Sequence, residues 1–478
     1  MTIVSQDKAT ADMPVEQFPE HRDRLTFIDH ISKFSGLAVA QLYLLVALIT
    51  AYEVVSRYVF DSPTQWVFEI VMVLCATAWM ISSGYITMHK RHIGINVLYL
   101  MAGDRTKWWL DLFAMYIGVL ALWLLIDDSI VRALESVDIV ERAGTAWNSP
   151  QPLILKSMLT IGATLYVIQL LVNLYRHYQG QAGKALISVI TLIIVARLVG
   201  VVGLHYGGDD SIFGQINSFF VALGAPFDPS QWLDVRAYSV AVASIAIVIA
   251  MLILMTTGMP LGIVTLFVSI LAALFFYGYG GLYLVSTNAF GLLEKYPLVA
   301  VPLFVLMASI LEKAGIAEDL FDAMSIFAGK LRGGVAIQTI VVAVILAAMS
   351  GVMGGEIVML GLVALPQLLR LRYDRKLSIG LICASGALAT LIPPSIIMIV
   401  YGLSAQVAIG DLFMAGFLPG LMLATFFGLY VVVRCTLNPS LAPTAEEVSK
   451  IRGETITMSR DKLAAVIFCV LLIGCVMG

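Results

Sequence analysis

The sequence has few charged residues for its length. Of its 478 residues, 13% are Asp, Glu, Lys or Arg, 60% are hydrophobic, and the formal net charge is −3. A soluble globular domain carries about 25% charged residues, and a protein that binds nucleic acid carries a basic excess. The composition therefore excludes both classes and indicates an integral membrane protein.

Motifs of metal sites, ATP use and intramembrane catalysis are also missing. The five cysteines lie in or beside apolar segments without metal or disulfide spacing, so we expect them to pack as small hydrophobic side chains. No G-x-x-x-x-G-K-[ST] segment is present, so no ATP-driven step is expected. An enzyme would need a motif such as H-E-x-x-H or G-x-S-x-G, and no histidine lies near Ser350 or Ser395 in the sequence. We therefore expect a protein that is not an enzyme.

Long apolar segments recur along the whole chain. About 20 apolar residues suffice to cross the hydrocarbon of a bilayer, and most of these segments are expected to be spanning helices. They are residues 37–55, 67–88, 108–126, 153–175, 185–204, 237–255, 261–277, 298–311, 335–369, 377–403, 412–433 and 463–476. The pattern predicts an all-α polytopic membrane protein.

The distribution of Lys and Arg predicts which loops lie in the cytoplasm. The polar N-terminal segment, 1–33, carries Lys8, Arg22, Arg24 and Lys33 and lacks the pattern of a cleaved signal peptide. The loop after the second span, 89–107, is basic, so both segments are expected inside. Residues 127–150 are mainly acidic, and residues 205–234 contain four Asp and no Lys or Arg, so both belong outside.

The apolar segment 335–369 has basic residues on both flanks. Arg332 precedes it, and Arg370 and Arg372 follow it. A segment with both ends in the cytoplasm must enter and return, so we expect a re-entrant hairpin that turns at SGVMGGE, residues 350–356. Irregular backbone at membrane depth is tolerated only where protein or a water-filled cavity covers it, so the turn is expected to line a site. The alternative is one long tilted helix whose small residues pack closely.

Two adjacent prolines, Pro393 and Pro394, interrupt the next apolar segment. Neither has an N–H, so the carbonyls of Ala389 and Thr390 are expected to lose their helical partners. Such carbonyls can bind a cation when they face a cavity, and the helix that restarts at Ser395 presents a positive dipole end to an anion. A plain proline kink is the alternative.

Several of these segments resemble the membrane components of tripartite ATP-independent periplasmic (TRAP) transporters. The segments similar to the large subunit are PLFVLMASIL (302–311), GKLRGGVAI (329–337), MSGVMGGEIVMLG (349–361), ALPQLLRLRYDRKLSIG (364–380), CASGALATLIPPSIIMIVYG (383–402) and DLFMAGFLPGLM (411–422). The segments similar to the small subunit are VSRYVFDSPTQWVFEI (55–70) and MHKRHIGINV (88–97).

The resemblance implies a domain order. Residues 1–183 correspond to a small-subunit-like four-helix domain, and 184–235 to a linking helix with a periplasmic loop. Residues 236–478 correspond to a large-subunit-like region that carries the first inverted repeat of an elevator-type transporter, while the second repeat of the family is missing from the sequence.

The resemblance also implies a function. We expect a Na⁺-coupled uptake component of the bacterial inner membrane, with its N-terminus in the cytoplasm, that takes a small organic anion such as a carboxylate from a periplasmic substrate-binding protein. The alternative is a non-transporting or truncated scaffold that needs a second polypeptide to complete the site.

The candidate site residues lie at the two interrupted segments. The candidate Na⁺ ligands are Ser350, Gly351, Gly354, Glu356, Gly386 and Thr390, and the candidate substrate contacts are Pro393, Pro394 and Ser395. Hydroxyl and carboxylate oxygens suit a small hard cation, glycine allows a carbonyl to turn, and an acid at membrane depth marks an ion path or a buried pair. Ordinary helix packing, interhelical hydrogen bonds and a structural carboxyl are the alternatives.

Other polar residues have structural interpretations. Glu53 and Arg57 lie one helical turn apart and are expected to form an ion pair. Arg197 lies in the middle of an apolar segment and must face protein or extend toward the interface. The tryptophans Trp108 and Trp109 are expected in an interfacial belt.

Overall fold

The structure is a computed structural model that describes residues 26–178, 180–208, 211–224, 239–324, 333–351, 353–443 and 467. In these ranges the regular secondary structure is helical, apart from one isolated backbone bridge between Gly94 and Pro260. Nine helices of the described residues are long and apolar enough to cross a membrane. The chain is thus an all-α polytopic membrane protein, as the sequence predicted.

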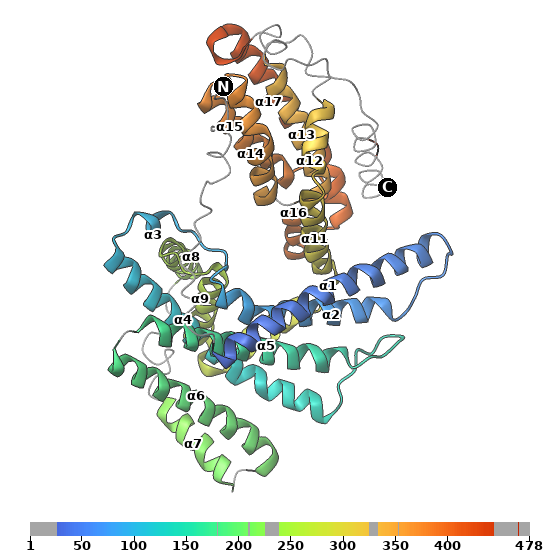
Figure 1. The fold of residues 1–478 in the computed structure, drawn as a ribbon. Helices are drawn as coiled ribbons and strands as arrows, with labels where there is room; N and C mark the ends of the chain where they lie inside the picture. Colours follow the sequence, from blue (N-terminus) through green and yellow to red (C-terminus); the bar gives the residue numbers. More distant parts are fainter. Residues whose placement is uncertain are drawn as a thin grey trace, which may run out of the picture. The chain divides into compact units, whose positions relative to one another are not determined.

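The order of the α-helices along the chain can be followed in Figure 1. They are α1 (Phe27–Tyr58), α2 (Val67–Met88), α3 (Val97–Met101), α4 (Asp104–Asp138), α5 (Gln151–His177), α6 (Gln181–Gly207), α7 (Ile212–Gly224), α8 (Val240–Thr256), α9 (Leu261–Tyr277), α10 (Leu282–Leu293), α11 (Ala300–Lys313), α12 (Ile316–Met324), α13 (Gly334–Ser350), α14 (Met353–Arg370), α15 (Arg375–Gly386), α16 (Ile396–Ala405) and α17 (Ile409–Leu437).

The predicted segments correspond to observed helices, but the sequence prediction missed α7, which lies in the expected outer loop 205–234, and also α10 and α12. Helices α2 and α9 have the predicted bounds, whereas α4 continues to Asp138, so Asp127 and Asp128 are helical and do not begin an outer loop. The loop prediction was wrong because acidic residues inside a helix are tolerated when basic side chains pair with them, as both of these are. The last predicted segment, 463–476, lies outside the described residues except for Ile467, as does Arg332.

The chain folds as two compact units. Unit 1 comprises the described residues up to Leu42 and from Ala76 to Leu292, and unit 2 comprises those from Tyr43 to Cys75 and from Leu293 onward. Unit 1 therefore combines most of the small-subunit-like region with the first helices of the large-subunit-like region.

The core of unit 1 forms where α4, α5 and α9 pack together. Ile126 of α4, Leu174 of α5 and Val264 of α9 are almost completely buried there. Gly118 allows the close approach of α4 and α9, since a Cβ at this position would lie 2.8 Å from Cδ1 of Ile263. Helix α9 of the large-subunit-like region is thus packed directly on the small-subunit-like region.

Arg197 joins the linking helix α6 to α4. Its Nε donates to Oδ1 of Asp127 at 2.8 Å, its Nη2 donates to Oδ2 at 3.1 Å, and its Nη1 donates to the side-chain oxygen of Asn217 on α7. The guanidinium therefore faces protein and does not extend to the interface. This ion pair between α4 and α6 fixes the register of the linking helix against α4.

Backbone hydrogen bonding connects the loop after α2 to the turn between α8 and α9. The N–H of Leu261 donates to the carbonyl of Ile93 at 2.8 Å, beside the bridge from Gly94 to Pro260. The predicted orientation assigns this loop and this turn to the same side of the membrane, and the hydrogen bond agrees with that assignment. Which side is cytoplasmic stays a prediction.

Unit 2 is built around α13. This helix carries no charged residue, and most of its side chains are buried against α12, α14, α15 and α17.

The expected ion pair near the end of α1 is confirmed, with Nη2 of Arg57 at 2.5 Å from Oε1 of Glu53. Of the cysteines, Cys75 and Cys435 are buried as expected, whereas Cys383 is exposed; Cys469 and Cys475 lie outside the described residues.

We predict that Arg197→Gln destabilises unit 1, because it leaves the Asp127 carboxylate, whose side chain is 27% exposed, without its guanidinium partner. The free energy of unfolding is expected to fall by about 1–3 kcal/mol, measured by heat or SDS unfolding of the detergent-solubilised chain. Ser188→Ala, at an exposed position of the same helix, serves as the control. A double variant that also carries Asp127→Asn should lose less than the sum of the single losses; strict additivity would contradict the pairing.

Candidate functional site

The hairpin expected at residues 350–356 is present. Helix α13 ends at Ser350, Gly351 adopts a left-handed conformation with φ +62°, and α14 begins at Met353 and packs against α13. Glycine is favoured at such a helix end because it has no Cβ to clash. The alternative of one continuous helix is therefore wrong, while the side from which the hairpin enters the membrane stays a prediction.

The helix after the hairpin is broken rather than kinked. Helix α15 begins after Asp374, whose Oδ1 accepts from the N–H of Leu377 at 2.9 Å, and ends at Gly386. A short 3₁₀ helix, η6 (Ala387–Thr390), follows, and helical structure resumes only at Ile396. Between them lie the two prolines, joined by a cis peptide bond.

The carbonyl of Thr390 loses its helical donor, as the sequence predicts, because Pro394 has no N–H. The carbonyl of Thr390 is not left without a partner, because the hydroxyl of Ser395 donates to it at 3.0 Å. The hydroxyl of Thr390 in turn donates to the carbonyl of Ala387 at 2.8 Å. The side chain of Ser395 is short enough to replace the missing backbone N–H. The carbonyl of Ala389 likewise loses its usual helical donor, since Pro393 has no N–H.

The hairpin tip and the broken helix touch each other, as expected. The N–H of Ile396, the first residue of α16, donates to the carbonyl of Gly351 at 3.4 Å. A Cβ on Gly351 would lie 2.5 Å from the carbonyl oxygen of Pro394. The structure therefore brings Gly351, Pro394 and Ser395 together from two separate segments.

The other two candidate glycines differ from Gly351. A Cβ on Gly386 would collide with the side chain of Ile357, so close packing of α14 and α15 accounts for this glycine. Gly354 is exposed and a Cβ there would meet nothing within 4 Å. Neither position needs glycine in order to turn a carbonyl toward an ion.

Buried side-chain oxygens without partners occur on α13, α14 and α15, the helices of the hairpin and of the segment that follows it. Among the described residues of these helices they are the hydroxyl of Ser350, both carboxyl oxygens of Glu356, the hydroxyl of Ser385 and, near the start of α13, Oε1 of Gln338. Glu356 and Ser385 are 0% exposed and Ser350 is 3% exposed. Ser385 lies beside Gly386, which touches Ile357, the neighbour of Glu356, so α14 and α15 hold these two residues close together.

These oxygens fit a small hard cation. A buried polar group without a partner costs about 1–3 kcal/mol, and hydroxyl and carboxylate oxygens are the ligands that hard cations prefer. In the described part of the chain, no cluster of three or more His, Cys, Asp or Glu could hold a transition metal. The sequence reasoning missed Ser385, although the adjacent Gly386 and the nearby Thr390 had pointed to this segment.

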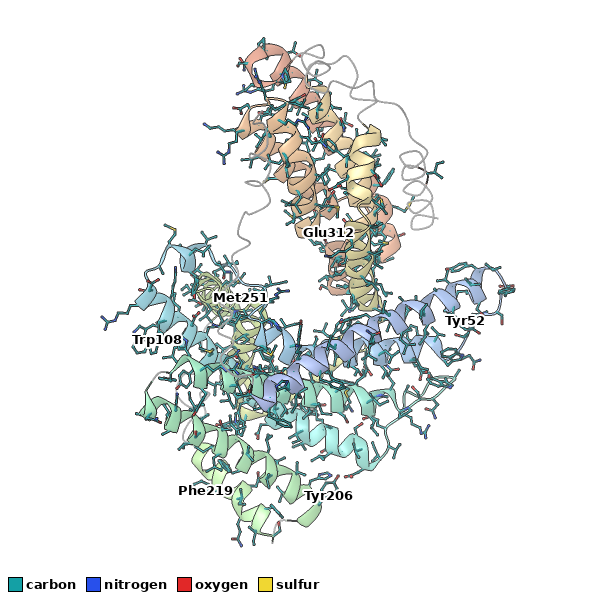
Figure 2. The ribbon with its side chains drawn as sticks, in the orientation of Figure 1. Tyr52, Trp108, Tyr206, Phe219, Met251 and Glu312 are labelled. Carbon is teal, nitrogen blue, oxygen red and sulfur yellow. The ribbon has the colours of Figure 1, made fainter. Side chains whose placement is uncertain are left out.

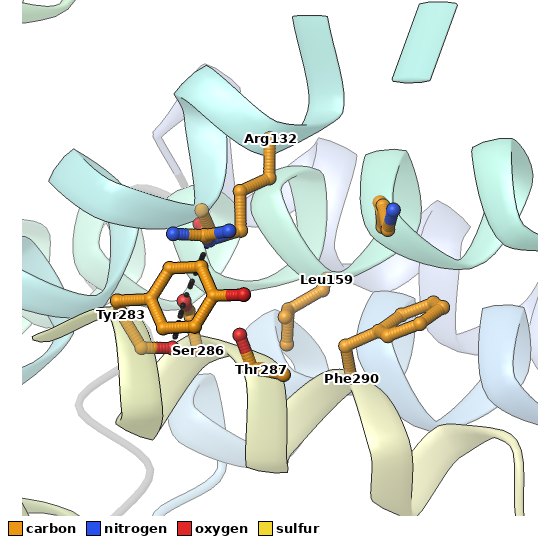
Figure 3. Close-up of a pocket in the computed structure, with 8 residues that line it drawn as sticks. Arg132, Leu159, Tyr283, Ser286, Thr287 and Phe290 are labelled. Atoms are coloured by element: carbon orange, nitrogen blue, oxygen red, sulfur yellow. Dashed lines mark hydrogen bonds between the residues drawn. The ribbon is translucent and has the colours of Figure 1, made fainter. Parts of the chain in front are cut away.

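A separate pocket of about 160 Å³ lies in unit 1, between α4, α5 and α10 (Figure 3). Its lining residues are Ser129, Arg132, Lys156, Leu159, Tyr283, Ser286, Thr287 and Phe290. Both cations in the pocket are paired with carboxylates, Arg132 with Asp128 at 2.8 Å and Lys156 with Glu141 at 2.5 Å. The pocket is therefore not a site of net positive charge.

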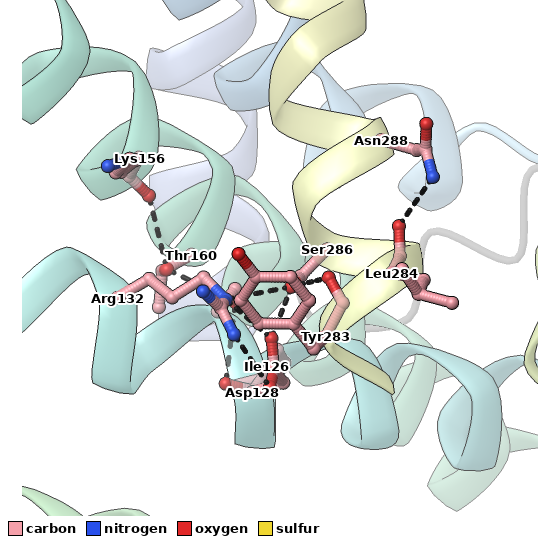
Figure 4. A network of polar contacts seen from close by, with 10 residues as sticks. Ile126, Asp128, Arg132, Lys156, Thr160, Tyr283, Leu284, Ser286 and Asn288 are labelled. Carbon is pink, nitrogen blue, oxygen red and sulfur yellow. Dashed lines mark hydrogen bonds and ion pairs between the residues drawn. The ribbon is translucent and has the colours of Figure 1, made fainter. Parts of the chain in front are cut away.

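The polar network beside this pocket links the two regions of the chain (Figure 4). Ser286 of α10 donates to Asp128 of α4, Nε of Arg132 lies 3.1 Å from the hydroxyl oxygen of Ser286, and the guanidinium lies 3.8 Å from the ring centroid of Tyr283. These contacts fasten the large-subunit-like helix α10 to the small-subunit-like helix α4.

A helical hairpin that meets an interrupted helix inside a polytopic membrane protein is typical of secondary transporters. Comparison with known families agrees. Residues 46–180 match tripartite ATP-independent periplasmic transporters, DctQ component, and residues 248–478 match the tripartite ATP-independent periplasmic transporter, DctM component. The chain belongs to the TRAP transporter family and joins a small-component and a large-component region in one polypeptide.

Curated relatives share parts of the chain. The C4-dicarboxylate TRAP transporter large permease protein of Pseudomonas aeruginosa is 32% identical over 38% of this chain and 42% of its own length. The ectoine TRAP transporter large permease protein of Halomonas elongata is 34% identical over 48% of this chain and 53% of its own length. The sialic acid TRAP transporter permease protein of Haemophilus influenzae is 24% identical over 82% of this chain and 60% of its own length. The chain thus spans about half the length of the large permease proteins that it matches.

We predict that Gly351→Ala disrupts the tip, because alanine is strained at a φ of +62° and its Cβ would press on the carbonyl of Pro394. The expected loss in the free energy of unfolding is about 1–3 kcal/mol, measured by thermal unfolding in detergent. The matched control is Gly354→Ala, three residues away, where a Cβ meets open space. Equal losses in the two variants would contradict the assigned contact between tip and break.

We predict that the Glu141–Lys156 pair makes stability depend on acid pH. Burial alone would raise the pKa of Glu141, but hydrogen bonds from Lys156 and Ser136, with the Lys156 charge, outweigh it and lower the pKa from its ordinary value of 4.5. The stabilisation is therefore present above the ordinary pKa and is lost as the pH falls through the lowered pKa.

The difference in melting temperature between the native chain and Glu141→Gln should accordingly be largest near neutral pH and vanish as the pH falls below 4.5 through the lowered pKa of Glu141. The exposed residue Glu135, substituted as Glu135→Gln, serves as the control. A difference for Glu141→Gln that stays constant over this pH range would show that the carboxylate does not act through the ion pair.

Proposed function

We propose that the chain is the membrane part of a Na⁺-coupled uptake system for a small organic anion that a periplasmic substrate-binding protein delivers. The observation that carries this proposal is the contact between the hairpin tip and the broken helix, beside buried oxygens that have no partner. Transporters with discontinuous helices bind their coupling ion and substrate at such interruptions.

In this proposal the coupling ion is held by side-chain oxygens of three helices. Ser350 comes from the end of α13, Glu356 from the first turn of α14 and Ser385 from the last turn of α15. The single carboxylate offsets the charge of one monovalent cation, and the two hydroxyls contribute neutral oxygens. Na⁺ entry then supplies about 2.3 kcal/mol per charge for each 100 mV of membrane potential.

The substrate contacts are proposed at the start of α16. The backbone around Ser395 and Ile396 forms the positive end of a helix dipole, which favours an anionic group. The compared relatives are named for C4-dicarboxylates, ectoine and sialic acid, and these compounds share a carboxylate. The proposed cargo is therefore a small carboxylate, and further large-component sequence is proposed to complete its site.

The proposed setting is the bacterial inner membrane, with the N-terminus in the cytoplasm. This orientation follows from the Lys and Arg residues of segments 1–33 and 89–107. It places the connection between α4 and α5, residues 139–150, on the side where the binding protein docks.

The test is carboxylate uptake into proteoliposomes that contain the complete transporter, with its binding protein and with an imposed Na⁺, K⁺ or proton gradient. We expect accumulation only with inward Na⁺. Ser385→Ala and Glu356→Gln should each raise the Na⁺ concentration for half-maximal uptake by about tenfold, the effect of losing one buried polar contact.

Ser404→Ala is the matched control, because Ser404 is exposed and its hydroxyl already donates to the carbonyl of Val400 at 2.9 Å. Its Na⁺ dependence should equal that of the native chain. Uptake that responds to no ion gradient would refute the coupling, and an unchanged Na⁺ requirement in both site variants would refute the assigned ligands.

A further inference from the structure

The connection between α2 and α4 exposes an apolar surface. We define the basic ledge as residues 89–109, which include the short helix α3. No residue of α3 is buried. The exposed apolar side chains of the ledge are Ile93 (82%), Ile95 (44%), Val97 (64%), Leu98 (54%), Leu100 (63%), Met101 (80%) and Trp109 (58%).

The ledge is too short to cross a bilayer and too apolar to face water alone. Helix α3 has five residues, whereas a span needs about 20. An isolated helix of this length would not form in water, and exposed apolar patches mark surfaces that something else covers. The ledge connects the ends of two spanning helices, so it lies where each of them leaves the apolar layer.

Positive charges stand at both ends of this apolar stretch. Lys90 and Arg91 follow α2, and Arg105 and Lys107 lie in the first turns of α4. No Asp or Glu occurs from residue 89 to residue 103. Within the described residues, Lys90, Arg91 and Arg105 form no ion pair, so their charges are available to an external anionic partner.

Several contacts hold the ledge in place. The backbone pairing of Ile93 with Leu261 anchors its first half to the turn before α9. The hydroxyl of Tyr99 donates to Oδ2 of Asp111 at 3.1 Å, and the ring of Tyr99 lies over Gly258, where a Cβ would come within 3.0 Å. The apolar side chains are thus presented from a fixed backbone.

We propose that the basic ledge binds anionic phospholipid of the adjacent bilayer leaflet. Its Ile, Val, Leu and Met side chains enter the boundary between headgroups and acyl chains, and Lys90, Arg91 and Arg105 contact the lipid phosphates. Trp108, labelled in Figure 2, and the exposed Trp109 lie in the first turns of α4, and aromatic side chains favour the membrane interface. The cations lie on both sides of the apolar side chains, at the ends of two spans. Charge complementarity therefore favours an anionic lipid over an apolar protein partner.

The test is native mass spectrometry of the full chain in detergent, titrated with phosphatidylglycerol or with phosphatidylcholine of the same acyl chains. We expect the triple variant Lys90→Gln, Arg91→Gln, Arg105→Gln to bind phosphatidylglycerol about tenfold more weakly, since each basic residue near an anionic lipid contributes to binding. Phosphatidylcholine binding should not change. The variant Leu98→Ser, Leu100→Ser, Met101→Ser should lose affinity for both lipids.

The control is the double variant Arg142→Gln, Lys295→Gln, which removes two exposed cations elsewhere in the chain. It should bind phosphatidylglycerol as the native chain does. The native chain itself gives a second measurement, because phosphatidylglycerol binding at the ledge must weaken as salt is added.

Three outcomes would overturn the proposal. The first is binding of phosphatidylglycerol to the native chain that does not depend on salt. The second is an equal loss of affinity for phosphatidylglycerol in the control and the triple variant. The third is loss of a chain dimer in the triple variant without loss of lipid, which would make a second copy the occupant. The measurement does not involve transport, so its result is independent of the proposed function.

Discussion

A polar group buried in an apolar helix bundle must find a partner inside the protein, since lipid offers none. At the break between η6 and α16, the two prolines remove backbone donors, and the hydroxyl of Ser395 replaces one of them by bonding the carbonyl of Thr390. The N–H of Ile396, at the start of α16, donates to the carbonyl of Gly351. Two hydrogen bonds thus stabilise the break and join it to the hairpin tip.

The oxygens that remain without partners stand out against this background. Among the described residues, Ser350, Glu356 and Ser385 keep free oxygens at full or nearly full burial, and Thr50 and Gln338 each have one unpartnered side-chain oxygen elsewhere in the helices. The cost of leaving them so is of the order of one lost hydrogen bond each, about 1–3 kcal/mol. When a site that binds and releases an ion is empty, its ligand oxygens have no partner. This is the physical argument for assigning these oxygens to cation binding.

The need of buried polar groups for partners inside the protein also explains how one polypeptide joins two transporter components. Asp127 and Asp128 are neighbours on α4, yet each pairs with a different arginine, Asp127 with Arg197 of the linking helix and Asp128 with Arg132. Through Ser286 the second pair extends to α10 of the large-component region. Together with the packing of α4 on α9, these polar contacts make the linking helix and the first large-component helices part of the same unit as the small component.

The sequence by itself determined the class, the helical spans, the hairpin turn and the break, because each follows from a local cause: long apolar runs, glycine at a left-handed helix end, and prolines that lack an N–H. It also indicated the family through segments that the comparisons matched. Only the tertiary structure decided which polar groups are satisfied. The repair of the Thr390 carbonyl by Ser395, the partner of Arg197, the packing role of Gly386 and the unpartnered state of Ser385 all depend on which side chains meet in space, and a linear pattern of residues does not contain those distances.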